Sequence, residues 1–347
     1  MRLLNKQVPQ HHPHPRSQQG ITLIELMIAL VIGLLATGAM LKVYVDSSRL
    51  YRFNEGLARI QENGRFGLEF IRRDARMAGF WGCYHGADLT NRISPGSTGY
   101  ISYESNDITG TNNDGLNSSD SITFSGAGNS VATVSSNMTS ADSAIPISST
   151  GNFELGEALL ISDCETADIF QLTSIGGSAP SLTLIHGTEG NTSLELSKAY
   201  AAGSRLYRVQ QITFCIAEGA NPAQPSLRQL VNPTSGQTCQ DHGDELVEGI
   251  ENMQVLFGED TEANDDGTNS DGTANRYLSF GADDLDMDRV VMDRVVSVRI
   301  FLLARSLNDN LTTEPSPYFF VDQEPAPDDK RLRKVFTTTI TLRNKTG

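Results

Sequence analysis

The first part of the chain contains an apolar run long enough to cross a membrane. Residues 21–41, which follow Gly20, contain one charged side chain, that of Glu25. At about 1.5 Å per residue, a helix of this length matches the roughly 30 Å hydrocarbon core of a bilayer. A carboxylate inside such a segment costs about 2.5 kcal/mol or more at depth. The run therefore predicts a transmembrane helix in which Glu25 is a functional candidate.

Two ordinary targeting segments compete with this interpretation. A secretory signal has an apolar core of about 7–15 residues followed by a cleavage site of small residues. Here the run is longer, and residues 36–39 form a poor site. A plain signal anchor fits the length and would orient with Arg2, Lys6 and Arg16 inside. It gives no reason for Glu25, and we regard it as the weaker interpretation.

The order G-I-T-L-I-E-L over residues 20–26 resembles the class III leader of type IV prepilins and pseudopilins. The resemblance implies that a peptidase cuts between Gly20 and Ile21 and that the new N-terminal residue is methylated. Residues 1–20 are then a removable leader. Ile21 departs from the Phe or Met that is usual after the glycine in this family.

Cleavage would place a cationic amine on Ile21, one helical turn from Glu25. Opposite charges in an apolar environment stabilise each other, while either one alone is costly. We expect the Ile21 amine of one subunit to meet Glu25 of a neighbour; pairing of Glu25 with its own amine is the alternative. Ala29, Gly33 and Thr37 recur every four residues, a weak signal for close helix packing in the membrane.

The helical pattern continues beyond the apolar run. No proline occurs between Ile21 and Phe80, and small or apolar residues continue at gaps of three and four. They are Leu50, Phe53, Leu57, Ile60, Gly64, Gly67, Ile71, Ala75 and Ala78. This stripe predicts one helix, membrane-embedded over 21–45 and amphipathic over 46–79, with Gly79 as its C-cap.

Three glycines lie in the amphipathic half, where each costs about 1 kcal/mol relative to Ala. Close packing of a sheet or of a neighbouring subunit against Gly56, Gly64 and Gly67 would explain them; helix flexibility is the alternative.

Residues 80–347 differ from the helix in composition and contain several strand-like runs. The predicted strands are 121–125, 144–148, 157–162, 168–174, 181–186, 205–216, 246–257, 294–305 and 334–343. Strands after one long helix indicate an α+β domain whose sheet covers the apolar stripe.

Charge and cysteine content limit the function further. The formal net charge is −15, and loss of the three basic leader residues takes it near −18, which argues against nucleic-acid binding.

The chain has four cysteines and no C-x-x-C pair; the cysteines are Cys83, Cys164, Cys215 and Cys239. Two disulfides fit an exported domain better than metal or redox chemistry. Three connectivities are open, and the least nested pairs Cys83 with Cys164 and Cys215 with Cys239.

A narrower resemblance covers most of the chain. Residues 73–83 (RDARMAGFWGC) look like the helix exit of PilW-type minor pilins. Fragments at 161–171, 246–258 and 295–300 follow in that family's order. The resemblance implies a pilin-like fold: a long N-terminal helix packed on an antiparallel β-sheet domain with extended loops.

One acidic loop suggests a metal. Asp260, Asp265, Asp266 and Asp271 are a weak calcium candidate, because clustered oxygen ligands suit Ca²⁺. Their spacing does not fit an EF-hand, and a solvated loop is the better interpretation. The second cluster, Asp283, Asp284, Asp286 and Asp288, is treated in the same way. No H-E-x-x-H, G-x-S-x-G or P-loop motif occurs, so we expect neither an enzyme nor a cofactor.

The resemblance to PilW implies a minor pilin that primes type IV pilus assembly at the inner membrane, near the pilus tip, with its globular domain in the periplasm. Implied partners are other minor pilins, the major pilin, the prepilin peptidase, the inner-membrane platform and a tip adhesin. A minor pseudopilin of type II secretion is the alternative within this class. A membrane-anchored adhesin, with residues 91–150 as its binding insert, is the alternative from another class. An anchored hydrolase is a third option without a supporting motif.

Overall fold

The fold is seen in a computed structural model. It describes residues 20–83, 89–97, 100, 107–148, 152–178, 180–222, 224–234, 236–262, 271–281, 292–321, 325 and 327–344. Leader residues 1–19, Asp265, Asp266 and the second acidic cluster lie outside the described residues. The chain divides into two compact units, Met1–Arg52 and Phe53–Gly347.

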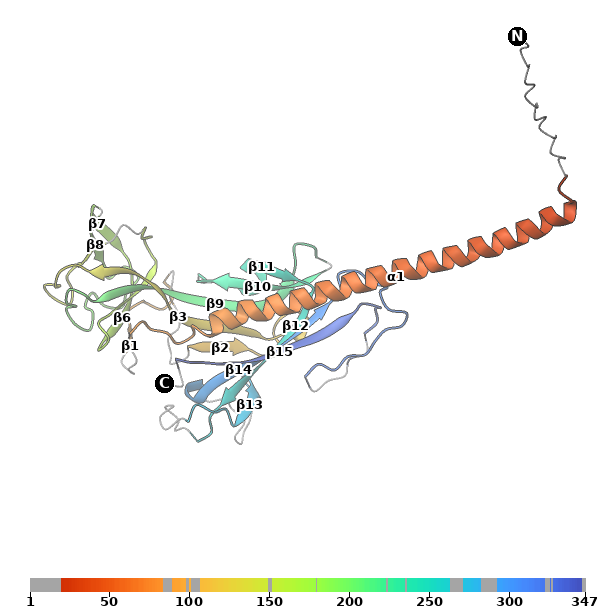
Figure 1. The fold of residues 1–347 in the computed structure, drawn as a ribbon. Helices are drawn as coiled ribbons and strands as arrows, with labels where there is room; N and C mark the ends of the chain where they lie inside the picture. Colours follow the sequence, from red (N-terminus) through yellow and green to blue (C-terminus); the bar gives the residue numbers. More distant parts are fainter. Residues whose placement is uncertain are drawn as a thin grey trace, which may run out of the picture. The chain divides into compact units, whose positions relative to one another are not determined.

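Helix α1 spans Leu23–Ala75, 53 residues, and begins in the first unit. Its N-terminal part is long and apolar enough to cross a membrane, and none of that window is buried by the chain itself. The helix is the orange ribbon in Figure 1. One long helix was predicted over residues 21–79, and the observed helix is shorter at both ends. Its apolar half is not buried by the chain itself, as expected of a segment that inserts into lipid or packs on other subunits.

The prediction that Gly79 caps this helix is wrong. The α-helix ends at Ala75, and residues 76–79 form turns. Gly79 does have positive φ, at 70°, but its N–H donates to the carbonyl oxygen of Ser125 at 2.9 Å. In a C-cap, the Gly79 N–H would donate to a carbonyl oxygen of the last helical turn. Here it donates to a carbonyl oxygen of a strand instead. The strand that contains Ser125 fixes where the chain turns.

The second unit holds two β-sheets. The larger one has eleven strands, of which eight follow the order β1-β6-β5-β9-β3-β4-β8-β7, with β10 and β11 continuing from β9 and β2 beside β3. All of its pairs are antiparallel except β1 with β6. The strands are β1 Leu89–Asn91, β2 Ile108–Thr111, β3 Ser121–Val134, β4 Ile145–Ser148, β5 Ala158–Ser162, β6 Ala167–Gln171, β7 Ser174–Ser178, β8 Ser181–Ile185, β9 Arg205–Glu218, β10 Pro225–Val231 and β11 Asp244–Glu248.

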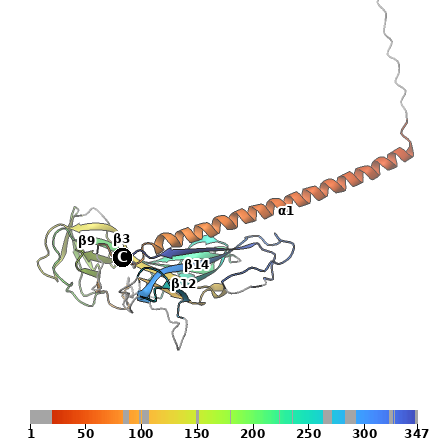
Figure 2. The ribbon, with the colours of Figure 1, turned by 60° about the horizontal axis from the view of Figure 1, so that its bottom comes forward.

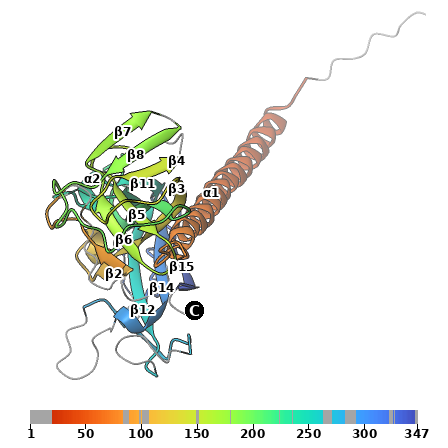
Figure 3. The same ribbon diagram turned by 90° about the vertical axis from the view of Figure 1, so that its left-hand side faces the viewer.

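The smaller sheet has four antiparallel strands in the order β13-β12-β14-β15. They are β12 Ile250–Glu259, β13 Arg276–Ser279, β14 Val295–Arg305 and β15 Arg333–Thr341. In Figure 3, β12, β14 and β15 are seen beside one another, near the last turns of α1. Short helical elements complete the fold: η1 Leu116–Ser118, α2 Cys239–His242 and η2 Met292–Arg294.

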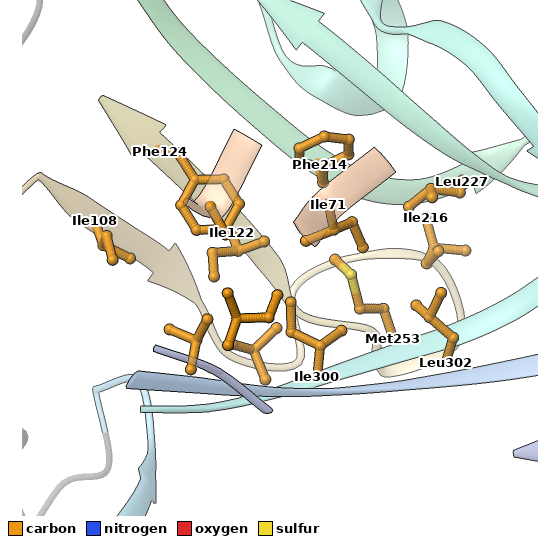
Figure 4. Packing of buried hydrophobic residues seen from close by; sticks show 14 of the residues in the cluster. Ile71, Ile108, Ile122, Phe124, Phe214, Ile216, Leu227, Met253, Ile300 and Leu302 are labelled. Carbon is orange, nitrogen blue, oxygen red and sulfur yellow. The ribbon is translucent and has the colours of Figure 1, made fainter. Parts of the chain in front are cut away.

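The largest hydrophobic core joins the C-terminal turns of α1 to both sheets. Ile71, fully buried, lies with Phe214 and Met253 in this cluster, as Figure 4 shows. From Ile60 to Ala75 the apolar stripe of the helix is thus covered by the sheets, as predicted, whereas Leu50 at the start of the predicted stripe is 61% exposed. Three further clusters lie away from the helix among the described residues: one around Phe170 and Tyr200, one around Trp81 and Tyr207, and a small one at Leu230.

The three helix glycines mark where the domain approaches α1 most closely. A Cβ at Gly67 would stand 2.9 Å from Leu302 Cδ1, and one at Gly56 would stand 2.6 Å from Leu311 Cδ1. Gly64 is the tightest position, against the ring of Phe336. Close packing of the domain against the helix therefore accounts for these glycines, and flexibility is not needed to explain them.

Most predicted strands are present, with shifted ends. The predicted strand 246–257 is instead two strands, β11 and β12, because Gly249 adopts φ 75° between them. The alternation predicted in the last strands is confirmed: Val298 and Ile300 are fully buried, and Ile340 opposite is nearly so. Strands β1, β2, β7, β10 and β13 were not predicted.

Both disulfides have the least nested connectivity. Cys83 pairs with Cys164, which ties the turn after α1 to the β5–β6 hairpin. Cys215 of β9 pairs with Cys239 of α2, and both half-cystines are buried. Each bond links segments that are far apart in sequence, and so restricts the unfolded chain.

Candidate functional site

The start of α1 is the candidate assembly site, and its first turn is capped. Thr22 precedes the helix, and its Oγ1 accepts a hydrogen bond from the Glu25 backbone N–H at 3.3 Å. Its carbonyl oxygen accepts from the Leu26 N–H at 3.2 Å. Thr22 is thus the N-cap and Glu25 the third helical residue, which is the spacing of a capping box. The sequence analysis missed this role, although the T-x-x-E pattern of residues 22–25 signals it.

Glu25 lies in the first turn, where the helix dipole favours a negative charge. Its side chain is exposed, and Ile21 beside it is 74% exposed. Among the described residues, no basic side chain or amine lies within ion-pair distance of Glu25. The carboxylate is therefore presented outward on an apolar surface, from a backbone turn that Thr22 caps.

Ala29, Gly33 and Thr37 lie on the exposed part of α1. A Cβ at Gly33 would meet nothing within 4 Å, so the described part of the chain leaves this position open. The hydroxyl of Thr37 donates to the carbonyl oxygen of Gly33 at 2.8 Å. Because the helix itself accepts this donor, Thr37 can enter an apolar environment without an unpaired polar group.

The two described ends of the acidic loop meet at one carboxylate, that of Asp260. Asp260 is fully buried, and its carboxylate accepts the backbone N–H groups of Glu262 at 3.0 Å and Asp271 at 2.9 Å. These bonds hold the two described ends of the loop together. Within the described ranges, no group of three or more His, Cys, Asp or Glu side chains is placed to hold a metal ion.

One of the fully buried carboxylates in the second unit, that of Asp168, stabilises the fold. Asp168 is fully buried and accepts from Arg92 Nε at 3.0 Å, the Ser197 N–H at 2.8 Å and the Tyr200 hydroxyl at 2.7 Å. Burial, and then the charge of Asp168, raises the pKa of Tyr200 well above its usual value. These bonds attach the segment before β9 to β6.

A second ionic network holds the long connection before β15. Arg333 donates to both oxygens of Glu251, from Nε at 2.6 Å and Nη2 at 3.0 Å, and also bonds Asp329. The hydrogen bond from Arg333 holds the pKa of Asp329 below its usual value. Arg333, Glu251 and Asp329 are thus all hydrogen-bonded, and we interpret the network as structural: it links β15 to β12.

Comparisons with known proteins agree with this geometry. The prokaryotic N-terminal methylation motif matches residues 15–41, which include the capped start of α1. The apolar helix and this motif fit a membrane-anchored pilus component.

The family described as type IV pilus-assembly protein W matches residues 213–344, from β9 to the end of β15. Together, the two matches and the long helix packed on antiparallel sheet support a PilW-type pilus-assembly protein. A type IV-like pilin from Thermus thermophilus is also similar: 13% identity, a TM-score of 0.23, and coverage of 56% of this chain and 86% of that one. The comparison with curated proteins gives no match.

Proposed function

We propose that this chain is a minor pilin that primes type IV pilus assembly at the inner membrane and stays near the pilus tip. The observation that carries the proposal is the capped first turn of α1. There, Glu25 is the only ionisable side chain within residues 21–41, an apolar helical surface that the described chain leaves uncovered. Such a surface needs lipid before assembly and other helices after it. The proposed role is structural and requires no reaction chemistry.

In the proposed mechanism, an ion pair between neighbouring subunits sets their axial position in the fibre. After cleavage at Gly20, the Ile21 amine would approach Glu25 of a neighbouring subunit, or the reverse. In a medium of low dielectric, an unpaired charge is costly and a matched pair is not, so the pair selects one axial position. Other minor pilins, the major pilin, the prepilin peptidase, the inner-membrane platform and a tip adhesin are the proposed partners.

Mass spectrometry of the N-terminus tests the proposal. The protein would be isolated from membranes and from sheared surface fibres of the producing cells. We expect a mature N-terminus at Ile21 carrying one added methyl group, in both fractions. A Gly20→Val variant, in which cleavage is blocked, is the control and should be absent from the fibres. An intact leader, or cleavage near residue 39, would overturn the proposal.

Deletion of the gene distinguishes a role in pilus assembly from a role in type II secretion. Loss of surface pili with normal export of secreted proteins supports the pilus role. Normal pili with blocked export would instead support a pseudopilin of type II secretion. Full function from a domain that lacks residues 21–45 would support a separate binding module, because assembly requires the apolar helix.

A further inference from the structure

One edge of the smaller sheet is open. Strand β15 pairs with β14 along its whole length, from Arg305 opposite Arg333 to Ser297 opposite Thr341. It is the terminal strand of the order β13-β12-β14-β15, so no described strand lies on its other side. In Figure 2 this strand is the dark blue one, seen next to the end of α1.

The hydrogen-bond register shows which residues of β15 face the open edge. In an antiparallel ladder, successive residues bond to opposite sides. Leu342 N donates to Val296 O at 2.9 Å, and Ser306 N donates to Leu332 O at 2.8 Å, so even-numbered residues of this strand bond to β14. The odd-numbered residues therefore direct their N–H and C=O groups outward; they are Arg333, Val335, Thr337, Thr339 and Thr341.

Over residues 335–341, this edge lacks the usual protection. Sheet edges in soluble domains are blocked by charged residues, proline, bulges or covering segments. Residues 335–341 read VFTTTIT and contain no charge, no proline and no glycine. Thr337, Thr339 and Thr341 are exposed, and β15 has no bulge in its pairing with β14. Among the described residues, no segment bonds to these outward amides.

A groove of about 650 Å³ lies beside the first half of the strand. Its lining includes Phe66, 49% exposed, and a set of charged residues from α1 and β15. They are Glu62, Arg65, Glu69, Arg72 and Lys334. Glu69 is paired with Arg72 at 3.8 Å. Within the described chain, Glu62, Arg65 and Lys334 have no ion-pair partner, so the groove lining carries one positive charge in excess.

We propose that the outer edge of β15 binds an extended segment of a different protein, added as a fifth strand. Only an extended backbone presents acceptors and donors at the spacing of the five outward residues. The segment would carry an acidic side chain near Arg65 and Lys334, an apolar one against Phe66, and uncharged residues along Thr337–Thr341. A second copy of this chain is disfavoured because each copy has a net charge of −15. The inference holds whether or not the chain is a minor pilin.

Photo-crosslinking of the full-length chain in membranes of producing cells tests the proposal. A benzophenone amino acid would replace Thr337, whose side chain is exposed and whose backbone faces the open edge. We expect one main product with another protein, and mass spectrometry should place the crosslink in a short segment of alternating uncharged residues with an acid at one end. A product with a second copy of this chain, or no product, would overturn the proposal.

Proline substitutions supply the matched pair of variants. Thr339→Pro removes one outward N–H and leaves the bonds to β14 intact, so the crosslink should fall by about tenfold or more. Ser279→Pro, on β13 at the opposite edge of the same sheet, should leave the yield unchanged. Equal loss in both variants, or in neither, would overturn the proposal. If Thr339→Pro does not fold, as judged by its thermal midpoint, Thr341→Pro tests the same edge at another outward amide.

Discussion

The ring of Phe336 lies directly against the backbone of Gly64, so that a Cβ at Gly64 would stand 2.3 Å from the ring carbons Cδ2 and Cε2. Through this contact, Phe336 of β15 packs directly on α1. It explains why a poor helix former is placed in the middle of a long helix. Because the neighbouring atoms belong to a ring rather than to a flexible chain end, little of the clash can relax.

Gly64→Ala is therefore expected to destabilise the globular domain. Overpacking costs about 1–3 kcal/mol, against which the better helix propensity of Ala returns about 1 kcal/mol. Gly56→Ala is the control, because its nearest neighbour is the flexible end of Leu311. Urea denaturation of the full-length protein in detergent measures both changes. A Gly64→Ala variant as stable as Gly56→Ala would contradict the close contact.

Asp120 should make stability depend on pH. Its carboxylate accepts the N–H of Asn113 at 2.9 Å and of Val255 at 2.8 Å, which joins the β2–β3 connection to β12. Burial raises the pKa of Asp120 from 3.8 to about 6. The folded state thus holds the proton more tightly than the unfolded chain, and the stability present below pH 4 is lost as pH rises through 6. At about 1.4 kcal/mol per pKa unit, the loss is at most about 3 kcal/mol.

Thermal unfolding at pH 4, 5, 6 and 7 checks this linkage. Asp120→Asn keeps the size of the side chain and one acceptor oxygen but cannot ionise, so its stability should vary less over that range. Asp142→Asn is the matched control, since that carboxylate is exposed and its pKa is lowered by the Ser140 hydroxyl. If Asp120→Asn follows the same pH profile as the unmodified protein, another group controls the titration.

The two disulfides should stabilise the domain to different extents. Cys83–Cys164 closes 81 residues and Cys215–Cys239 closes 24. The loop-entropy relation gives about 4.5 kcal/mol for the longer loop and about 3.5 kcal/mol for the shorter one. Paired serine replacements, each removing one bond, should lower the thermal midpoint in that order. The opposite order would mean that burial of the second bond, between β9 and α2, outweighs chain entropy.

Local pattern predicted much of this fold because several elements have strong periodicity. The alternation of Val296, Val298 and Ile300 predicts β14, since one face of that strand is buried. The stripe from Ile60 to Ala75 predicts the packed half of α1 for the same reason. Strand β7 has two glycines and no fully buried residue, so only pairing with β8 makes it a strand. Pairing is non-local, and the sequence contains no signal for it.

The sequence predicted one residue of the candidate site, Glu25, but not Thr22 or the open edge of β15. Glu25 is visible in the sequence because a single carboxylate in an apolar run is costly wherever the helix lies. Thr22 was missed although its capping role is local, whereas the open edge of β15 was beyond any local pattern. Whether an edge is free depends on which strands lie beside it, and here that follows from the order β13-β12-β14-β15.

Glu25→Gln should block incorporation into fibres without affecting cleavage. The substitution keeps the size of the side chain and its place in the capped turn, but removes the charge that would meet the Ile21 amine of a neighbour. Because an unpaired amine in an apolar bundle costs several kcal/mol, we expect the variant to be at least about tenfold depleted in sheared fibres and normally processed in membranes. Immunoblots of both fractions measure the ratio. Glu55→Gln is the control, since Glu55 on the same helix forms only an exposed pair with Arg59 at 3.2 Å. Equal incorporation of the two variants would mean that Glu25 does not set the register of the subunit.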